Sequence, residues 1–265
     1  MREGSTVIEV CMPTWESEPV LKSSLTKLAK SEDNSEVTIS SLRIIDNNSE
    51  DQTVSIAQRL AEKFGWNLKL QSRPCSLPEA REIAINSVET EWFLFLDDDV
   101  RITQDYLSTL VEAISPLTGA VQGRKAEKIS SNQVSKRISD ISDSNTDWVR
   151  KRSFRGGTHA TLIRTEAARG VDFPDDLHVW EDEYLRRHIE SSGYIWIFNH
   201  QSIFEHESQD RHPPSWQEGY LQAKYKLRPF WHVFLNLPYA LLTGKSPIGY
   251  ILMILGYMRG TLDQP

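Results

Sequence analysis

The sequence predicts an α/β protein in which a mostly parallel sheet is flanked by helices. From residue 6 to about residue 125, short β-rich runs alternate with segments of helical periodicity. Such alternation is typical of right-handed crossovers between parallel strands, with helices on both faces of the sheet. The run WFLFL at 92–96 has no polar position, which is expected of a strand that is buried on both sides.

Periodicity and cap residues define the individual elements. Apolar residues at 20, 21, 25 and 28 share one face of a helix, and Ser or Thr commonly precedes a helix as its N-cap. Gly193 is expected to end the last helix of the series. We predict strands at 6–12, 41–47, 67–71, 92–97, within 154–164, at 194–198 and at 201–206, and helices at 19–30, after Ser49, from Ser76, after Thr103 and from about Glu181.

Composition and charge argue against several classes of protein. The chain has 265 residues, 39% of them hydrophobic, which is enough for one sizeable core. A net charge of −7 and a pI near 5.6 argue against general nucleic-acid binding. The two cysteines, Cys11 and Cys75, lack metal-ligand spacing, so neither a disulfide scaffold nor a structural zinc site is expected. We expect a protein of the reducing cytoplasm, without a signal peptide or a membrane-spanning helix.

Polar clusters follow three of the predicted strands. They lie at 13–16, 46–48 and 97–99, and the last consists of Asp97, Asp98 and Asp99. The carboxyl ends of parallel strands meet at one edge of a sheet, so these clusters should converge on one crevice. No glycine-rich phosphate-binding motif is present, which leaves a divalent cation held by carboxylates as the means of binding phosphates. The alternative interpretation of the three acids is a charged, solvated turn.

Two further groups could carry chemistry. Glu181 and Asp182 stand at a predicted helix start, where acids interact favourably with the helix dipole. They are explained either as a helix-start signature or as a carboxylate poised to act as a base. His206 is either a structural histidine or an imidazole ligand beside hard oxygen ligands, a combination that suits Mn²⁺.

Taken together, these features resemble the family 2 glycosyltransferases of the GT-A fold over about residues 6–207. PTWE at 13–16 matches the segment after the family's first strand, and IIDNNS at 44–49 matches its acid-rich segment, which makes Asp46 the residue that reads the base. LPEAREIAI at 77–85 matches a segment whose arginine commonly lies near the diphosphate or supports the acid loop, and FLFLDDD matches the D-x-D motif. The resemblance implies that the nucleotide sugar is bound by Pro13, Thr14, Glu16, Asp46, Arg81, Asp97 and Asp98.

The later motifs are also similar to those of the family. WEDEYL at 180–185 matches its E-D motif, and GGTHATLIR at 156–164 matches a glycine-containing segment on the acceptor side. A late histidine in the family is commonly preceded by a G-Y pair, here at 193–194. The resemblance implies a catalytic base at Asp182 with Glu181 beside it, metal ligation by Asp99 and His206, and acceptor-side positions for Gly156 and Gly157.

The implied activity is transfer of a sugar, of the hexosyl type, from a UDP-, GDP- or dTDP-sugar to a hydroxyl of a saccharide or lipid-linked acceptor. Inversion in a single displacement would use Asp182 as the base and a divalent metal, Mn²⁺ or Mg²⁺, on the leaving diphosphate. Two alternatives remain. One is a transferase that uses polyprenyl phosphate as its acceptor, and the other is a catalytically silent subunit that binds nucleotide sugars.

The resemblance and the composition together divide the chain. Residues 1–210 are expected to form the catalytic domain, with a donor half at about 1–125 and an acceptor half at about 154–210. The polar segment at about 126–153 is predicted to be a mobile loop. Residues 211–265 are expected to form an apolar helical extension.

The extension contains two apolar stretches, 228–242 and 248–258, each too short to span a bilayer. They could pack on the catalytic domain. A peripheral position on the cytoplasmic face of a membrane is favoured, because the second stretch has no polar face to expose to water. The residues expected near the lipid head groups are Trp231, Tyr239, Lys245, Tyr250 and Arg259.

Overall fold

The computed structural model describes residues 5–126, 155–206, 214–242 and 246–264. The predicted loop at about 126–153 lies almost entirely outside these residues. The chain divides into two compact units, and the boundary falls within helix α8 (Glu181–Ser191), after Tyr184. The first unit comprises Met1–Ala126, Gly156–Pro174 and Leu185–Glu207, and the second comprises Glu127–Arg155, Asp175–Tyr184 and Ser208–Pro265.

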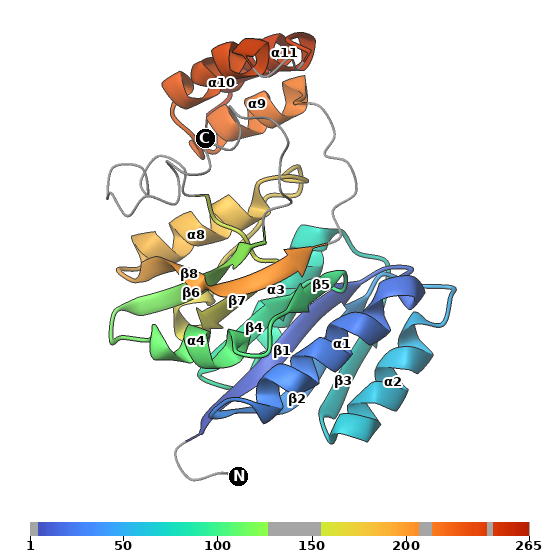
Figure 1. The fold of residues 1–265 in the computed structure, drawn as a ribbon. Coiled ribbons are helices and arrows are strands. Elements are labelled where there is room, and N and C mark those ends of the chain that lie inside the picture. The colour runs from blue at the N-terminus through green and yellow to red at the C-terminus, as the bar shows by residue number, and fades with distance from the viewer. Residues whose placement is uncertain (1–4, 127–154, 207–213, 243–245, 265) are drawn as a thin grey trace. The chain divides into compact units, whose positions relative to one another are not determined.

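The first unit is built on one eight-stranded sheet (Figure 1). Its strands are β1 (Thr6–Thr14), β2 (Val37–Asp46), β3 (Asn67–Ser72), β4 (Trp92–Leu96), β5 (Val100–Ile102), β6 (Thr118–Lys125), β7 (Ala160–Arg164) and β8 (Ile195–His206). Their order is β3-β2-β1-β4-β7-β6-β8-β5. The pairs β1–β2, β1–β4, β2–β3 and β6–β8 are parallel, as the alternation predicts for the first half. β7 runs antiparallel to β4 and β6, and β5 runs antiparallel to β8.

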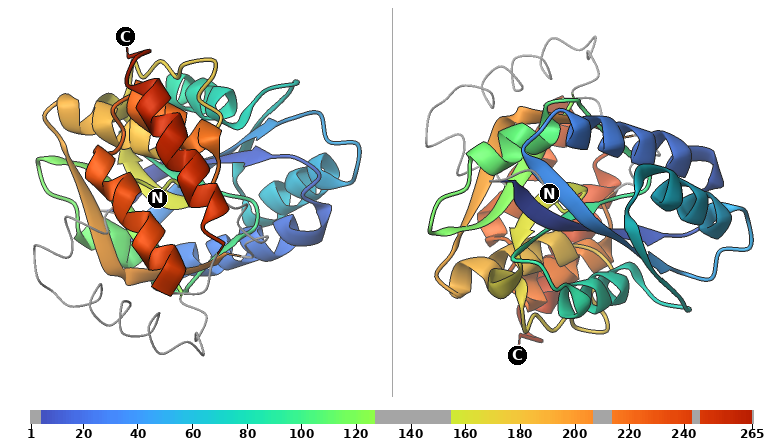
Figure 2. Two further views of the ribbon diagram at one scale, coloured as in Figure 1. Left: turned by 90° about the horizontal axis from the view of Figure 1, so that it is seen from above. Right: turned by 90° about the horizontal axis from the view of Figure 1, so that it is seen from below.

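Helices cover both faces of this sheet (Figure 2). Besides α8 they are α1 (Glu18–Asp33), α2 (Thr53–Phe64), α3 (Leu77–Ser87), α4 (Tyr106–Glu112) and the short α7 (Thr165–Ala168). Apolar side chains of α1, α2 and α4 share one core with β1, β2 and β4, in which Leu25, Ile44 and Leu94 are fully buried. α3 packs on the opposite face and buries Ala84 and Ile85. The predicted α/β class, with helices on both faces, is confirmed.

Two predicted helix caps are wrong, and both hydroxyls donate to groups outside the helices instead. Ser49 does not cap α2, and its hydroxyl donates to Asp46. Thr103 does not cap α4, and its hydroxyl donates to the carbonyl of Ile203 in β8. Ser76 does cap α3, as predicted. A hydroxyl that could cap a helix end thus does not do so when the folded chain holds another acceptor within hydrogen-bonding distance of it.

The last two predicted strands form one strand. β8 runs without interruption from Ile195 to His206 and pairs with both β6 and β5. β5 has only three residues and β6 contains two glycines, so neither carries a strong strand pattern, and the sequence analysis assigned neither. Gly193, with φ of 88°, adopts the left-handed conformation expected after α8.

Besides the first turn of α8, the second unit contains three helices within the described residues. They are α9 (Trp216–Lys224), α10 (Phe230–Leu242) and α11 (Ile248–Gly260). Its small core includes Ala223, Met253 and Tyr257. α9 begins with a capping box, in which Ser215 and Glu218 satisfy each other's backbone N–H groups. In the part of the chain that the structure describes, no helix combines the length and the apolarity needed to cross a membrane.

Candidate functional site

The carboxyl ends of β1 and β2 are joined through Asp46. Thr14 and Asp46 are partners across the two strands. Asp46 is buried, and one of its carboxylate oxygens accepts hydrogen bonds from the hydroxyls of Thr14 (3.0 Å) and Ser49 (2.6 Å). The other oxygen accepts a hydrogen bond from the N–H of Ser49 at 3.0 Å. This carboxylate is therefore fixed at the edge of the sheet where two of the predicted polar clusters meet.

Glu16 closes the turn that follows β1. Its carboxylate accepts a hydrogen bond from the N–H of Glu50 at 2.7 Å, and its own N–H donates to the hydroxyl of Ser49 at 2.9 Å. Its φ of 49° is a left-handed conformation, which costs a non-glycine residue about 1 kcal/mol. Pro13 lies just before this turn in β1, and Trp15, within the turn, is 66% exposed. The turn therefore presents an exposed aromatic ring at this edge of the sheet.

Asp97, the first residue after β4, is held by two side chains and one backbone group. Its carboxylate accepts hydrogen bonds from Nη2 of Arg81 at 3.3 Å and from Nδ1 of His159 at 2.6 Å. Its N–H donates to the carbonyl of His159 at 2.8 Å. Burial alone would raise the pKa of Asp97, but the hydrogen bond from His159 and the charge of Arg81 outweigh it and hold the pKa well below its usual range. Asp97 therefore stays ionised.

Asp98 has the opposite electrostatic character. Burial raises its pKa to about 6, the hydroxyl of Ser17 that donates to its carboxylate opposes this shift, and the charges of Asp97 and Asp99 add to it. A cation beside these carboxylates would lower the pKa of Asp98 again, because it favours the charged form. The crowding of the three acids thus creates a repulsion that a cation relieves.

Asp99 lies against His206, the last residue of β8. Nε2 of His206 is 3.0 Å from Oδ2 of Asp99, and His206 is also the strand partner of Val100 in β5. Nζ of Lys125 lies 3.3 Å from Nδ1 of the same imidazole. The rings of His159 and His206 have their centroids 4.7 Å apart. The antiparallel pairing of β5 with β8 therefore brings His206 to the acidic cluster, which consists of Asp97, Asp98 and Asp99.

A carboxylate and an imidazole, such as those of Asp99 and His206, are groups that a divalent cation can accept as ligands. Among the residues that the structure describes, no three His, Cys, Asp or Glu side chains surround a common metal position. Mg²⁺ is usually bound by one or two protein carboxylates plus phosphates and water, at about 2.1 Å from each ligand atom. Asp99 and His206 are themselves in direct contact, with 3.0 Å between the carboxylate oxygen and the imidazole nitrogen.

His159 belongs to this cluster, and the sequence analysis did not select it. It lies in the segment whose glycines are expected on the acceptor side. Because β7 pairs antiparallel with β4, Ala160 stands opposite Leu96, and His159 falls beside Asp97. The only signal in the sequence is a histidine directly before a short strand, and that signal does not name the strand's partner.

Gly157 lies close to the end of the Gln122 side chain. An added Cβ would lie 2.7 Å from Nε2 of Gln122. The N–H of Gly157 donates to Oε1 of Gln122 at 3.0 Å, and the same oxygen accepts a hydrogen bond from Nε1 of Trp196 at 2.9 Å. Gly157 thus lies against the end of the Gln122 side chain, and Gly156 precedes it in the same segment before β7.

In the second unit, Asp182 lies at the start of α8. Its side chain is buried, and its Oδ1 accepts a hydrogen bond from the N–H of Glu183 at 2.8 Å and lies 3.5 Å from Nη2 of Arg155. The guanidinium of Arg155 stacks on the indole of Trp180, 3.7 Å from the ring centroid. Trp180 has φ of 72° and directly precedes Glu181. This helix start combines a positioned carboxylate with strained backbone, which is frequent at functional sites.

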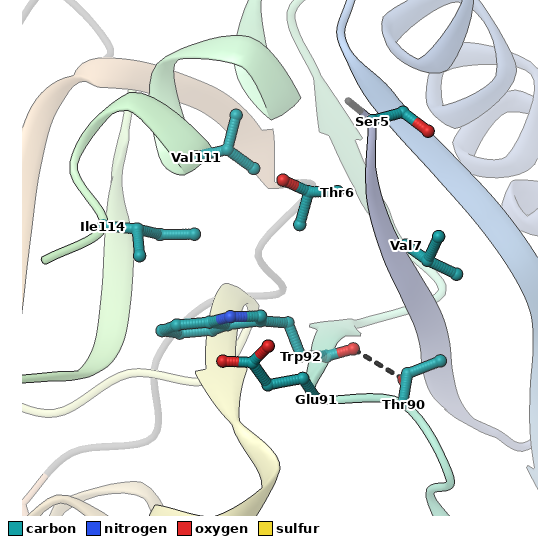
Figure 3. A pocket seen from close by; sticks show the side chains of 8 residues that line it. All are labelled: Ser5, Thr6, Val7, Thr90, Glu91, Trp92, Val111 and Ile114. Atoms are coloured by element: carbon teal, nitrogen blue, oxygen red, sulfur yellow. Dashed lines mark hydrogen bonds between the residues drawn. The ribbon is translucent and has the colours of Figure 1, made fainter. Parts of the chain in front are cut away.

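A separate hollow of about 510 Å³ lies at the other end of the sheet (Figure 3). It is lined by Thr6 and Val7 at the start of β1, by Trp92 at the start of β4, and by Val111 and Ile114. Because β1 and β4 are parallel, their first residues lie at the edge opposite to the acids that follow β4. The hollow is therefore distinct from the acidic cluster.

Comparison with protein families identifies the chain's family. The family described as Glycosyl transferase family 2 matches residues 9–172, which is more than half of the chain. This span includes the acidic cluster, Arg81 and His159. No curated protein matches the chain.

Solved structures share the fold at low sequence identity. The mannosyltransferase PcManGT from Pyrobaculum calidifontis, in complex with GDP-Man and Mn²⁺, is 18% identical, with a TM-score of 0.61 over 95% of this chain and 69% of that one. S. aureus TarS 1-349 with UDP is 16% identical, with a TM-score of 0.59 over 86% and 65%. Glucosyl-3-phosphoglycerate synthase from Mycobacterium tuberculosis, with Mn²⁺, UDP and phosphoglyceric acid, is 14% identical, with a TM-score of 0.53 over 78% and 72%. These likenesses show the GT-A fold, and the chain spans about two thirds of the length of each neighbour.

Proposed function

Because this chain belongs to glycosyltransferase family 2, we propose that it transfers a hexosyl group from a nucleotide-diphosphate sugar to a hydroxyl of a saccharide or lipid-linked acceptor. The observation that carries the proposal is the Asp99–His206 pair beside Asp97, Arg81 and His159 at the carboxyl ends of the strands. Proteins of the same fold bind GDP-Man with Mn²⁺ and UDP with Mn²⁺ or Mg²⁺, which supports a nucleotide sugar and a divalent metal as partners here.

The proposed donor site uses its carboxylates in different ways. Asp46, fixed at the sheet edge, contacts the nucleotide base, and the turn at 13–16 shapes the surface around it. Arg81 is a positioning residue, since its buried guanidinium holds Asp97. Asp98 faces the ribose and the phosphates. Because its pKa is raised, the charged form of Asp98 is the one that a bound cation would stabilise most.

Asp99 and His206 are the proposed protein ligands of Mn²⁺ or Mg²⁺. When bound, the ion supplies a Lewis acid that stabilises the charge of the leaving diphosphate. Asp97, kept ionised by His159 and Arg81, adds a negative charge that favours a cation nearby. His159 orients Asp97 through Nδ1 and the carbonyl, so the cluster is held in place before a substrate binds.

Asp182 is the proposed base. The oxygen of the acceptor hydroxyl bonds to the anomeric carbon while the bond from that carbon to the diphosphate oxygen breaks, and the hydroxyl proton passes to Asp182. This single displacement inverts the anomeric centre. Arg155 orients the carboxylate, and Glu181 shares the first turn of the helix. Gly156 and Gly157 form part of the acceptor side.

We place this reaction in the cytoplasm. Cys11 and Cys75 are both free thiols. Burial raises the pKa of each thiol, so neither is an activated nucleophile. Unpaired thiols of this kind persist in a reducing compartment.

Calorimetry tests the donor and the metal together. UDP-, GDP- and dTDP-sugars are titrated into the protein with and without Mn²⁺, and we expect one base to bind in a metal-dependent way. Asp99→Ala should weaken that binding roughly 10- to 100-fold. Asp105→Ala, which removes an exposed acid outside the cluster, is the matched control. Binding by none of the nucleotides, or full metal-dependent binding by Asp99→Ala, would contradict the proposal.

Turnover measurements test the base. Asp182→Asn should lower kcat by roughly 10²- to 10⁴-fold while leaving nucleotide affinity unchanged. Asp175→Asn, at an exposed acid of the same unit, should leave both unchanged. If Asp182→Asn retains full turnover, the acceptor needs no base, and a polyprenyl phosphate, whose oxygen is already ionised, replaces the hydroxyl acceptor in the proposal.

A further inference from the structure

α10 and α11 expose apolar faces. Of the eighteen large apolar side chains that are exposed in the described ranges, twelve lie within residues 230–262. Figure 2 shows the two helices side by side. Helices on the surface of a soluble domain normally expose a polar face. The exposed side chains, which define the α10–α11 surface, are Phe230, Trp231, Phe234, Leu235, Leu241, Leu242, Ile248, Ile251, Leu252, Leu255, Met258 and Leu262.

The exposed side chains follow the helical period, so each helix contributes one continuous stripe. On α11 and just beyond it they recur at 248, 251, 252, 255, 258 and 262, in steps of one, three or four residues. On α10 they recur at 230, 231, 234 and 235 and again at 241 and 242. Scattered apolar residues on a surface are ordinary, but twelve exposed apolar side chains on and beside two adjacent helices favour an interaction site.

The opposite face of α11 is already occupied by α9. A Cβ on Gly256 would lie 1.9 Å from the carbonyl oxygen of Trp216, and a Cβ on Gly260 would lie 2.2 Å from that of Tyr220. In apolar helices, G-x-x-x-G spacing commonly forms the contact between two chains in a membrane. Here the two glycines serve a contact within the unit. A partner of this unit therefore has the exposed stripes available and not the glycine face.

The charge of this region selects the kind of partner. Residues 214–264 contain five Lys or Arg against two Asp or Glu, whereas the whole chain carries 30 Lys or Arg against 37 Asp or Glu. Lys226 is exposed just before α10, and Arg259 is exposed near the end of α11, where it pairs with Asp263. An anionic lipid surface complements both the apolar stripes and the excess of positive charge. Two copies of this surface facing each other would bring like charges together.

We propose that the α10–α11 surface binds the interface of a membrane that contains anionic lipids, with both helices lying in the membrane plane. Each helix has 13 residues, about 20 Å in length, which is too short for a hydrocarbon core of about 30 Å. Trp231 is an exposed aromatic residue of the kind found at head-group depth. Tyr250 instead packs against the core of its unit. Lys245 and the side chain of Tyr239 lie outside the described residues.

Vesicle co-sedimentation of the full chain tests this surface, and it does not depend on the proposed transferase reaction. One set of vesicles contains phosphatidylcholine alone, and the other also contains phosphatidylglycerol. We expect binding to the anionic vesicles, and binding that weakens severalfold without phosphatidylglycerol and at high salt.

Three variants locate the contact. Ile251→Ser and Leu255→Ser should each weaken vesicle binding by roughly tenfold, since each removes an exposed apolar side chain from the stripe of α11. Lys226→Glu should weaken binding to anionic vesicles by roughly fivefold or more and leave binding to phosphatidylcholine unchanged. Leu117→Ser, at a comparably exposed leucine of the first unit, is the matched control. Circular dichroism verifies that the variants remain folded.

Three results would overturn the proposal. The first is an absence of binding to either type of vesicle. The second is binding that Ile251→Ser and Leu255→Ser leave unchanged. The third is a dimer in sedimentation velocity that the same two variants dissociate, because the surface would then belong to a second copy of the chain.

Discussion

Asp97 and Asp98 are neighbours in the chain, yet their pKa values move in opposite directions. Burial acts on both carboxylates and would raise both pKa values. Asp97 has a guanidinium and an imidazole as partners, and these lower its pKa, whereas at Asp98 the hydroxyl of Ser17 and the backbone N–H of Asp99 oppose the rise without reversing it. Partners therefore decide the charge of each acid. Asp97 stays ionised, whereas a bound cation would favour the ionised form of Asp98.

The hydrogen bond from His159 to Asp97 leads to a prediction on donor binding. His159→Ala removes that bond, so Asp97 loses its orientation, and we expect the affinity for a nucleotide with Mn²⁺ to fall roughly tenfold. His159→Asn, which retains a donor group, should recover part of the loss. Calorimetry measures both variants, and His178→Ala, at an exposed histidine, serves as the control. Unchanged affinity in His159→Ala would show that the bond has no role in binding.

Glu9 is a buried carboxylate away from the acidic cluster. It lies 3.0 Å from Arg43 and 3.2 Å from Lys69. Burial by itself would raise the pKa of Glu9, but the N–H of Glu89, the hydroxyl of Ser41 and the charge of Arg43 together lower it below its usual 4.5. A lowered pKa means that ionised Glu9 stabilises the fold, and this stabilisation is fully present above the usual pKa of 4.5. The stabilisation is lost as the pH falls through the lowered value.

Glu9→Gln should therefore reduce the free energy of unfolding by about 1–3 kcal/mol at neutral pH, since it removes the charge that the two cations and the hydrogen bonds stabilise. The difference from the wild type should shrink as the pH falls below about 4. Urea unfolding at a series of pH values measures this, with the exposed Glu62→Gln as control. A cost that does not change with pH would rule out the ionic contribution.

At the scale of elements, the contact between α9 and α11 depends on glycines rather than on large side chains. Gly219 and Gly256 each lie where an added Cβ would come within 2 Å of a carbonyl oxygen of the facing helix. Close backbone approach leaves the larger apolar residues of α11 for its exposed stripe. The glycines therefore explain how α11 packs against α9, and the larger apolar residues of α11 lie on its outer face.

Gly256→Ala tests this packing. In an open helix, alanine would stabilise by about 1 kcal/mol relative to glycine. Here the added methyl group would lie 1.9 Å from a backbone oxygen, so the helices must separate. We expect a net loss of about 2 kcal/mol or more in unfolding free energy. Leu255→Ala, at the exposed neighbour, should cost less than about 0.5 kcal/mol. Equal costs in the two variants would contradict the close contact.

At the scale of the whole molecule, the acidic cluster couples stability to ligands. Three acids follow one buried strand, and burial and mutual repulsion disfavour the charged form of Asp98. A metal with a nucleotide diphosphate binds the folded state and should relieve this repulsion. A ligand that binds only the folded state stabilises it by about 2.7 kcal/mol at 100 times its Kd.

Thermal unfolding should therefore show a Tm that rises by about 5–10 °C with Mn²⁺ and the preferred nucleotide together. The shift should be lost on adding EDTA, because the proposed diphosphate site is incomplete without the cation. Asp99→Ala should show no metal-dependent shift, while the exposed Asp105→Ala should behave as the wild type. A full shift in EDTA would argue for nucleotide binding without a metal.

Much of the first unit could be predicted from local patterns. Helical periodicity and uninterrupted apolar runs identified β1, β4 and the helices between them, and the position of the acids after WFLFL placed the candidate site at the carboxyl ends of the strands. The caps at Ser49 and Thr103 were wrong because Ser49 donates to Asp46, three residues before it, and Thr103 donates to the carbonyl of Ile203 in β8. His159 could not be chosen, since its role depends on the pairing of β7 with β4.

The sequence by itself determined the α/β class, the family resemblance and the acids at the end of β4, because periodicity and the position of a residue within its strand are local properties. The tertiary structure decided which side chains meet. Antiparallel pairing of β7 with β4 and of β5 with β8 brings His159 to Asp97 and His206 to Asp99. It also decided which apolar residues of α11 are buried against α9 and which are exposed. Both outcomes depend on contacts between segments far apart in the chain, which no local pattern specifies.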